Sequence, residues 1–375
     1  MPLANSPEQT SVLTEKLHQR ISRGIAESKP FIDKIETEGK IMNDFIMPLG
    51  SNRNVSFSNT DTQVLMNIDS ATPGESKIFS MHPHAIYQAS DKLGAHPTYI
   101  KSLVNSRQAW EIQLAAHALN EHAAHSPRQR VLVREVGNQV RGVLSDQYRR
   151  LNSGLIYESF IKSSQQMGGI IYSAFADDTR SWIEVLLPTP IDIPTTKNGI
   201  LTVAYGIRIA TSDFGDGALD MRAFMIQVVC LNGMVRDTIL REVHHGNKIH
   251  GDIELSNKTY KLDTQTQASF VHDAVKSLLN KEAIVKNVTD IQKASAMTID
   301  LDVEFKKLAK VGLTKGEVTQ TKEIITNNRT DDGVQGENTL WKLAQGIGAI
   351  ARTAEQRRKR ELEEISGSLF ARINE

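Results

Sequence analysis

A cluster of basic side chains interleaved with tyrosines is the best candidate in this sequence for binding a ligand. From Arg128 to Lys162 there are seven basic and three acidic residues, so the local net charge is +4. Cationic groups follow a phosphate backbone and aromatic rings stack on bases, a combination typical of contact with a single strand. We predict this contact at Arg134, Arg141, Tyr148, Arg149, Arg150 and Lys162. A solvated sheet face with core tyrosines is the alternative.

Aspartates form a second group, at positions where the pattern predicts hairpin turns. Two turns at one edge of a sheet could bring carboxylates together around a divalent cation. Aspartate is also common in β-turns, because its side chain bonds the turn backbone. We favour the turn interpretation and assign no metal site. The group consists of Asp177, Asp178, Asp213, Asp216 and Asp220.

Two histidine groups lack the spacing of a metal site. A helical zinc pair needs histidines four positions apart with a carboxylate between them. The first group has spacings of five and three, and HHGNKIH matches no ligand pattern. We therefore expect solvent-facing or loop histidines at His117, His122, His125, His244, His245 and His250.

The sequence offers neither a nucleophile nor a phosphate loop. Cys230 lies within MIQVVCLNGM, the most apolar stretch, where a buried thiol is inert. The GxG of LAQGIGAIA follows no strand, and GxxxxGK[ST] does not occur, which argues against dinucleotide binding and a P-loop ATPase. We predict no cofactor and no catalytic residue.

Composition narrows the class of protein. The chain has 375 residues, of which 39% are hydrophobic, and 44 basic residues balance 44 acidic ones. That balance argues against a protein that coats duplex DNA by charge alone. A single cysteine, no long apolar run and no signal-peptide pattern in MPLANSPEQTSVLTEK predict a cytoplasmic protein without a membrane partner.

Apolar periodicity predicts an α+β fold: a mostly antiparallel sheet of about six strands with helices on one face, flanked by helical regions. Residues 1–75 are predicted as an irregular arm, with helical spacing broken near Pro30, and a partner-binding helix is the alternative for their first part. Residues 76–250 form the core, with a helical module at 80–126 and the sheet at 129–235. Residues 251–375 are predicted as helical. In the module, one helix face holds Ala85, Ile86, Ala89 and Leu93, and another holds Trp110, Leu114, His117 and Leu119.

The sheet region reads as two strands, a helix and four strands. RVLVRE and VRGVLS form a hairpin around VGNQ, and a helix capped by Ser153 follows. Two more hairpins turn at Asp177-Asp178 and at FGDG. The tail QRRKRELEE is predicted as a solvated helix with the pairs Arg357–Glu361 and Lys359–Glu363.

Four stretches resemble blocks of the phage/plasmid-like proteins that carry domain of unknown function nine hundred thirty-two. They are FSMHPHAIYQASDKLGAHPTYIKSLV, VLVREVGNQVRGVLSDQYRRL, AFMIQVVCLNGMV and NTLWKLAQGIGAIA with ELEEISGSL. The resemblance implies a phage, prophage or plasmid origin and the host cytoplasm, and it transfers no catalytic residue. The order of elements is also similar to phage single-strand annealing proteins, in which a hairpin and a helix form a DNA groove in a ring or filament.

Three functions therefore remain open. The first is binding of single-stranded nucleic acid in recombination, replication or host takeover, without chemistry of its own. The second is a structural or inhibitory protein that binds a host or phage protein through its helical ends. The third is a metal-dependent enzyme that uses the turn aspartates or His244 and His245. Assembly into a homo-oligomer is compatible with the first two.

Overall fold

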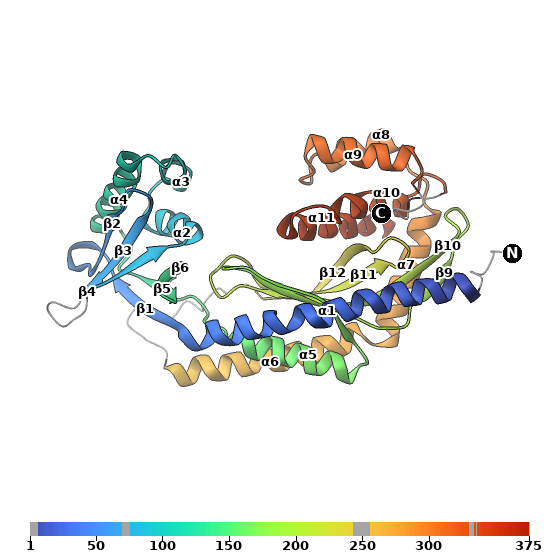
Figure 1. Ribbon diagram of the computed structural model, residues 1–375, viewed down its shortest axis with the longest axis horizontal. Coiled ribbons are helices and arrows are strands. Elements are labelled where there is room, and N and C mark those ends of the chain that lie inside the picture. The colour runs from blue at the N-terminus through green and yellow to red at the C-terminus, as the bar shows by residue number, and fades with distance from the viewer. Residues whose placement is uncertain (1–6, 70–75, 243–255, 330–333, 335, 375) are drawn as a thin grey trace.

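The computed structural model describes residues 7–69, 76–242, 256–329, 334 and 336–374, and it divides into two lobes (Figure 1). The described residues contain two six-stranded sheets, one in each lobe. This confirms the α+β class, the predominantly antiparallel pairing and the helical terminal regions. It also separates the predicted sheet: the first hairpin lies in the small lobe, and the later strands lie in the large lobe.

The small lobe is a sheet covered by three helices. Its strand order is β1-β5-β6-β4-β3-β2, antiparallel except for the parallel β4–β6 pair. The strands are β1 (Met42–Pro48), β2 (Val55–Asn59), β3 (Val64–Asp69), β4 (Ser76–Met81), β5 (Arg130–Val136) and β6 (Gln139–Ser145), and a short 3-10 turn spans Gly50–Asn52. The helices are α2 (Pro83–Leu93), α3 (Pro97–Asn105) and α4 (Ala109–Ala124).

The helical module at 80–126 is present, but only one of its two predicted faces is correct. Ala85, Ile86, Ala89 and Leu93 of α2 are all buried. In α4 the prediction was wrong, because Trp110 is 62% exposed. The buried face of α4 is instead lined by small and aliphatic residues: Ile112, Ala115, Ala116, Leu119 and Ala123. Ala115 and Ala116 are both buried and widen this face. The spacing of the large apolar residues alone did not indicate that.

The large lobe is built on the sheet β12-β11-β10-β8-β7, with β9 paired to β10. Its strands are β7 (Ile170–Ala176), β8 (Ser181–Leu186), β9 (Ile191–Pro194), β10 (Ile200–Thr211), β11 (Leu219–Gln227) and β12 (Asn232–Glu242). Its helices are α5 (Ser153–Gln166), α6 (Asn257–Leu278), α7 (Lys281–Ala296), α8 (Leu301–Leu308), α9 (Lys315–Thr326), α10 (Leu340–Ala351) and α11 (Gln356–Ser368), and a 3-10 segment spans Leu369–Asn374.

Helices cover both faces of this second sheet. On one face the Tyr205 hydroxyl of β10 donates to the Leu278 carbonyl of α6 at 2.8 Å. On the other face Arg208 of β10 bonds Glu363 of α11, and Leu17 of the N-terminal helix packs in one cluster with Tyr172 of β7. Such two-sided cover explains why nearly every residue of β8 and β10 is buried.

The N-terminal region contains one long helix in place of the predicted irregular arm. Helix α1 (Pro7–Ile41) is 35 residues long and continues through Pro30, where we expected a break. Pro30 is exposed, so water can reach the carbonyl that its ring leaves without an amide donor. The helix crosses the large lobe and leads directly into β1 of the small lobe (Figure 1). Its contact with the sheet is close at Gly24, where an added Cβ would lie 2.1 Å from the Tyr172 carbonyl oxygen.

Local predictions in the sheet region were largely correct. The β5–β6 hairpin turns at Gly137 and Asn138, which both have positive φ (58° and 66°) as a two-residue hairpin turn requires. The N-cap of α5 is Asn152 and not Ser153, because the Asn152 side chain accepts from the Leu155 amide. Cys230 is buried, as predicted. No helix in the described ranges is long and apolar enough to cross a membrane.

We predict opposite effects for two glycines of α1. Gly24→Ala forces the helix away from the Tyr172 backbone and should lower the free energy of unfolding by about 1–3 kcal/mol. Gly39→Ala is the matched control, since nothing lies within 4 Å of its Cβ position, and it should raise stability by about 0.5–1 kcal/mol. Urea unfolding of both variants tests this, and equal effects would contradict the close docking of α1.

Candidate functional site

The candidate site is the joint between the lobes, where the loop after β10 inserts into the small lobe. Three successive carbonyls of this loop accept hydrogen bonds from small-lobe side chains. Tyr148 donates to the Ser212 carbonyl at 3.0 Å and Arg134 to the Asp213 carbonyl at 2.6 Å. The Phe214 carbonyl lies 3.0 Å from His84 Nε2 and accepts from Gln88 Nε2 at 2.9 Å. We call these contacts the loop latch.

Arg134, a predicted contact residue, belongs to this latch. Its side chain is 3% exposed and grips Asp44 of β1 with two bonds of 2.8 and 2.9 Å. Burial alone would lower the pKa of Arg134, but the Asp44 carboxylate outweighs it and raises that pKa. Its guanidinium also lies 5.8 Å from the Tyr148 ring centroid. Both predicted residues therefore hold the two lobes together.

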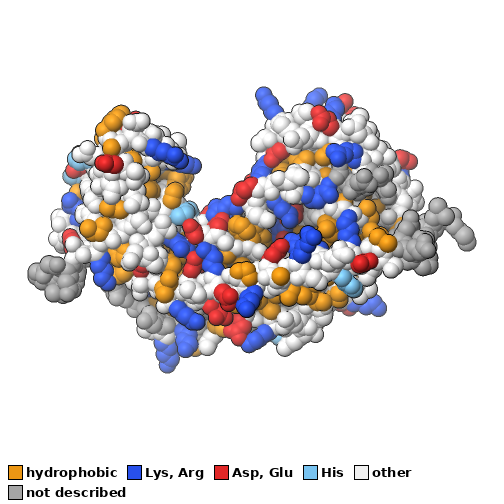
Figure 2. Space-filling view, in the orientation of Figure 1, with side chains coloured by type: hydrophobic (Ala, Val, Ile, Leu, Met, Phe, Trp, Pro, Cys, Tyr) orange, Lys and Arg blue, Asp and Glu red, His pale blue; other side chains and the backbone are white. Residues whose placement is uncertain are grey.

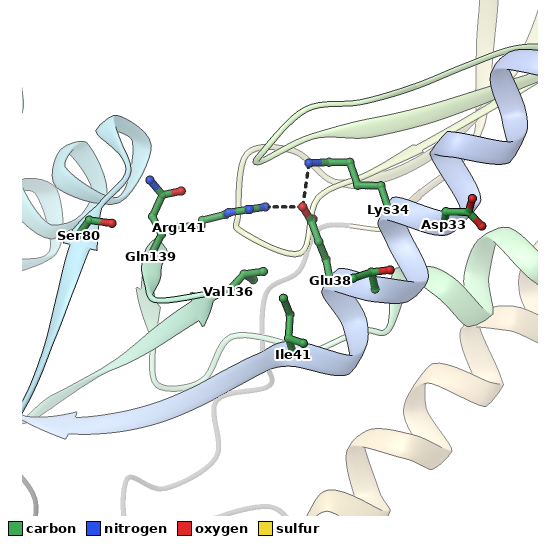
Figure 3. A pocket seen from close by; sticks show the side chains of 10 residues that line it. Asp33, Lys34, Glu38, Ile41, Ser80, Val136, Gln139 and Arg141 are labelled. Carbon is green, nitrogen blue, oxygen red and sulfur yellow. Dashed lines mark hydrogen bonds and ion pairs between the residues drawn. The ribbon is translucent and has the colours of Figure 1, made fainter.

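Arg141 lies on a different side of α1, in a pocket of about 650 Å³ between α1 and the small-lobe sheet (Figure 3). Arg141 and Lys34 both point at Glu38 and bond it at 2.8 Å each. Lys34 also reaches Asp178 at 3.3 Å. Figure 2 shows basic and acidic side chains interspersed along the hollow between the lobes. Arg141, Lys34 and Glu38 at this pocket are thus paired with one another, whereas Asp33, the fourth charged residue of its lining, pairs with no described side chain.

Arg149 and Arg150 reach the N-terminal part of α6, on the same side of the joint as Arg134. Arg149 Nε donates to Asp263 at 2.6 Å. Arg150 lies 3.6 Å from Asp44, and its guanidinium carbon is 4.8 Å from the Tyr260 ring centroid. Arg141 also contacts the large lobe, because its guanidinium lies 5.9 Å from the Phe214 ring centroid and 3.8 Å from the Asp178 carboxylate. The structure thus brings five of the six predicted residues to the joint.

Lys162, the sixth, is distant from the latch, on the exposed face of α5. Its side chain is 67% exposed and pairs with Glu158 one turn earlier.

The turn aspartates do converge, but on arginines. Asp177 and Asp216 both pair with Arg357 of α11, at 2.7 and 2.9 Å. Burial raises the pKa of Asp177, but bonds from Arg357 and two backbone amides lower it overall. The predicted pair Lys359–Glu363 is present at 3.9 Å, whereas Arg357 reaches the turns instead of Glu361. Thus the basic tail is not a solvated helix, because Arg357 holds it against the turns that contain Asp177 and Asp216.

Asp213 differs from the other turn aspartates. It accepts from the Ser153 hydroxyl at 2.7 Å, at the first turn of α5. Burial raises the pKa of Asp213, although the Arg134 charge and the Ser153 bond act in the opposite direction. Among the residues that the structure describes, no group of three or more His, Cys, Asp or Glu could hold a metal ion.

His117 and His122 of α4, and His125 directly after it, are exposed. His244, His245 and His250 lie outside the described residues.

A groove runs from the joint along α1 and α5. It consists of two pockets of about 720 and 580 Å³, which share Ile35, Gly39, Asn152, Gly154 and Leu155 as lining. Arg150, Tyr260 and Lys261 line its first half, and Lys40 and Lys162 line its second. We call this feature the α1–α5 groove.

Two lysines of the groove were not predicted from the sequence. Lys40 and Lys261 are exposed, and neither forms an ion pair with any described side chain. Their positions follow from helix α1, which was predicted as an arm, and from the packing of α6 on α5. A search for clustered charge could not find them, because about 220 positions of chain separate the two.

Comparisons with known proteins give no relative. No family model matches the chain, and no curated protein or solved structure matches it either. The resemblance to phage/plasmid-like proteins therefore stays a prediction.

The loop latch predicts a stability cost for Tyr148→Phe. The variant leaves the buried Ser212 carbonyl without its hydroxyl donor and should lower the free energy of unfolding by about 1–2 kcal/mol. Tyr99→Phe, at a 53% exposed tyrosine, should change it by less than about 0.5 kcal/mol. Chemical denaturation measures both, and equal stabilities would show that the hydroxyl does not contribute to the latch.

Two turn aspartates should respond oppositely to neutralisation. Because the pKa of Asp213 is raised in the fold, its ionised form destabilises the fold above that pKa. Asp213→Asn should therefore raise the melting temperature at pH 7, and the gain should shrink as pH falls through the raised pKa. Asp216→Asn should lower it, because Arg180 loses its carboxylate partner and Arg357 keeps only Asp177. Melting curves at pH 7 and pH 4 would refute this assignment if Asp213→Asn were destabilising at pH 7.

Proposed function

We propose that this protein binds single-stranded nucleic acid along the α1–α5 groove, without chemistry of its own. The setting that we propose is recombination, replication or host takeover by a phage or plasmid. The observation that carries the proposal is the pair of exposed lysines on the groove, Lys40 and Lys261, with Tyr260 in the same lining. Arg150 and Lys162 add positive charge, although each lies beside a carboxylate, Asp44 or Glu158. Concave, cationic and aromatic surfaces are suited to an unpaired strand.

The proposal moves the contact from the first hairpin to the groove. Arg134 and Arg141 already bond Asp44 and Glu38, so a phosphate would have to displace those carboxylates. Lys40 and Lys261 have no such competitor among the described side chains. They can neutralise phosphates directly and release the counterions that make binding favourable.

The groove also contains acidic residues, which limit how strongly it can bind. Asp44 and Asp213 line the half that holds Arg150 and Lys261, and Glu36 and Glu158 line the half that holds Lys40 and Lys162, so four carboxylates accompany the four cations. Together with the neutral net charge of the chain, they imply few phosphate contacts and an affinity that low salt strengthens.

A protein partner is the second candidate, and the apolar wall of the groove favours it. The half nearer Lys162 is lined by Phe31, Ile32, Ile35, Leu155 and Ile161. An amphipathic helix from a host or phage protein could place its apolar side there and its charges against the mixed rim. Insensitivity of such binding to salt would distinguish it from a strand. A metal-dependent enzyme gains no support from the described residues.

We predict that reversing two charges abolishes much of the strand binding. Lys40→Glu with Lys261→Glu should reduce the slope of log affinity against log salt by about 1.4, since each phosphate contact on a single strand contributes about 0.7. Affinity at low salt should fall at least about tenfold. Fluorescence anisotropy with labelled 20-nucleotide strands measures both.

The control variant carries the same charge change elsewhere. Lys286 and Lys310 are exposed residues of the large lobe, outside the lining of the α1–α5 groove. Their double change to glutamate should leave the salt slope unaltered. Equal losses in the two double variants would remove the groove as the binding site, and no binding of any strand by the wild-type protein would refute the function.

A further inference from the structure

The half of the α1–α5 groove next to the joint has the size and lining of a pocket for one small ligand. Its volume of about 720 Å³ falls within the range of small-molecule sites, roughly 300–1,000 Å³. Ile35, Met42 and Leu155 supply apolar surface to it. Arg150 and Lys261 supply positive charge, and Asp213 and Asn152 supply further polar atoms.

Two polar atoms of the residues that line this pocket can each form a further hydrogen bond. One carboxylate oxygen of Asp213 accepts from Ser153, and no described residue donates to the other, Oδ2. Asn152 uses its carbonyl oxygen to accept from the Leu155 amide, which leaves its Nδ2 donor without a described partner. Ser153 follows Asn152 in the chain and bonds Asp213, so Asn152 and Asp213 lie near one another in the lining of the pocket, and we call these two side chains the polar cluster.

We propose that this pocket binds one base of the strand and selects a base that bears an exocyclic amino group. The proposal rests on the proposed function, because it treats the pocket as a part of the strand site. The amino group of cytosine donates to Asp213 Oδ2, and its ring nitrogen accepts from Asn152 Nδ2. The adjoining phosphates lie toward Lys261 and Arg150.

Thymine fits the same cluster poorly. Where cytosine has an amino group, thymine has a carbonyl oxygen, which would face the Asp213 carboxylate acceptor to acceptor. Its ring N–H would likewise face the Asn152 N–H group. A site whose polar groups stay unpaired rejects the ligand that fails to pair them. Discrimination therefore arises from repulsion of thymine as well as attraction of cytosine.

The test compares two pyrimidine strands of equal length. Labelled 20-nucleotide strands of deoxycytidine and of thymidine are titrated at pH 8 and low salt, with deoxycytidine monophosphate titrated by calorimetry as the free ligand. The wild-type protein should bind the cytidine strand about tenfold more tightly, within the range expected for paired base contacts. Asp213→Asn, which places a donor or a weaker acceptor at Oδ2, should reduce the ratio to about one.

Asp216→Asn is the matched control, because this loop aspartate does not line the pocket. It should keep the preference for cytidine. Equal binding of both strands by the wild-type protein would overturn the base pocket while the proposed function stands. Saturable binding of the monophosphate, lost in Asp213→Asn, with no binding of either strand, would support the pocket and overturn the strand function. Binding of neither strand nor monophosphate would overturn both.

Discussion

The structure depends on hydrogen bonds between backbone carbonyls of the β10–β11 loop and side-chain donors of the other lobe. A loop buried between two sheets cannot leave its polar groups unpaired without a large free-energy cost. Tyr148, Arg134 and Gln88 supply those donors from three separate places in the sequence. Arg134 in turn must be neutralised, which fixes Asp44 and hence the edge strand β1. This loop thereby contributes to how the two lobes pack, together with α1, which leads directly into β1.

Neutral net charge has a structural meaning here. Many arginines are held inside the molecule by carboxylates, and the most buried set joins Arg208 to Glu184 and Glu363, all at most 3% exposed in their side chains. Burial raises the pKa of Glu363, whereas the Arg208 charge keeps that of Glu184 lowered. Removal of one partner would leave an uncompensated charge in the core, so these pairs specify how α11 sits on the sheet.

What the sequence could predict was local. Period-two alternation found the β5–β6 hairpin, and apolar spacing found the buried side of α2, because both signals lie within a dozen residues. The pairing of β1 with β5 joins Asp44 to Arg134, 90 residues apart, and nothing near either residue announces the partner. The prediction for helix α1 failed for another reason. Pro30 suggested a break, and the buried stripe of the helix is narrow. Most of the arginine cluster lies at the joint, but whether its charges are available to a ligand depends on carboxylates that are distant in the sequence.

Helix α1 is synthesised well before β7, the strand on which it docks. Tyr172, which meets Gly24, follows it by roughly 150 residues, or roughly 7–30 s at a typical rate of translation. During that interval the stripe around Leu17 and Ile21 has no sheet to cover it. A more apolar helix would expose more hydrophobic surface during this interval and would aggregate more readily. The weak apolar pattern that concealed this helix in the sequence is thus an advantage to the nascent chain.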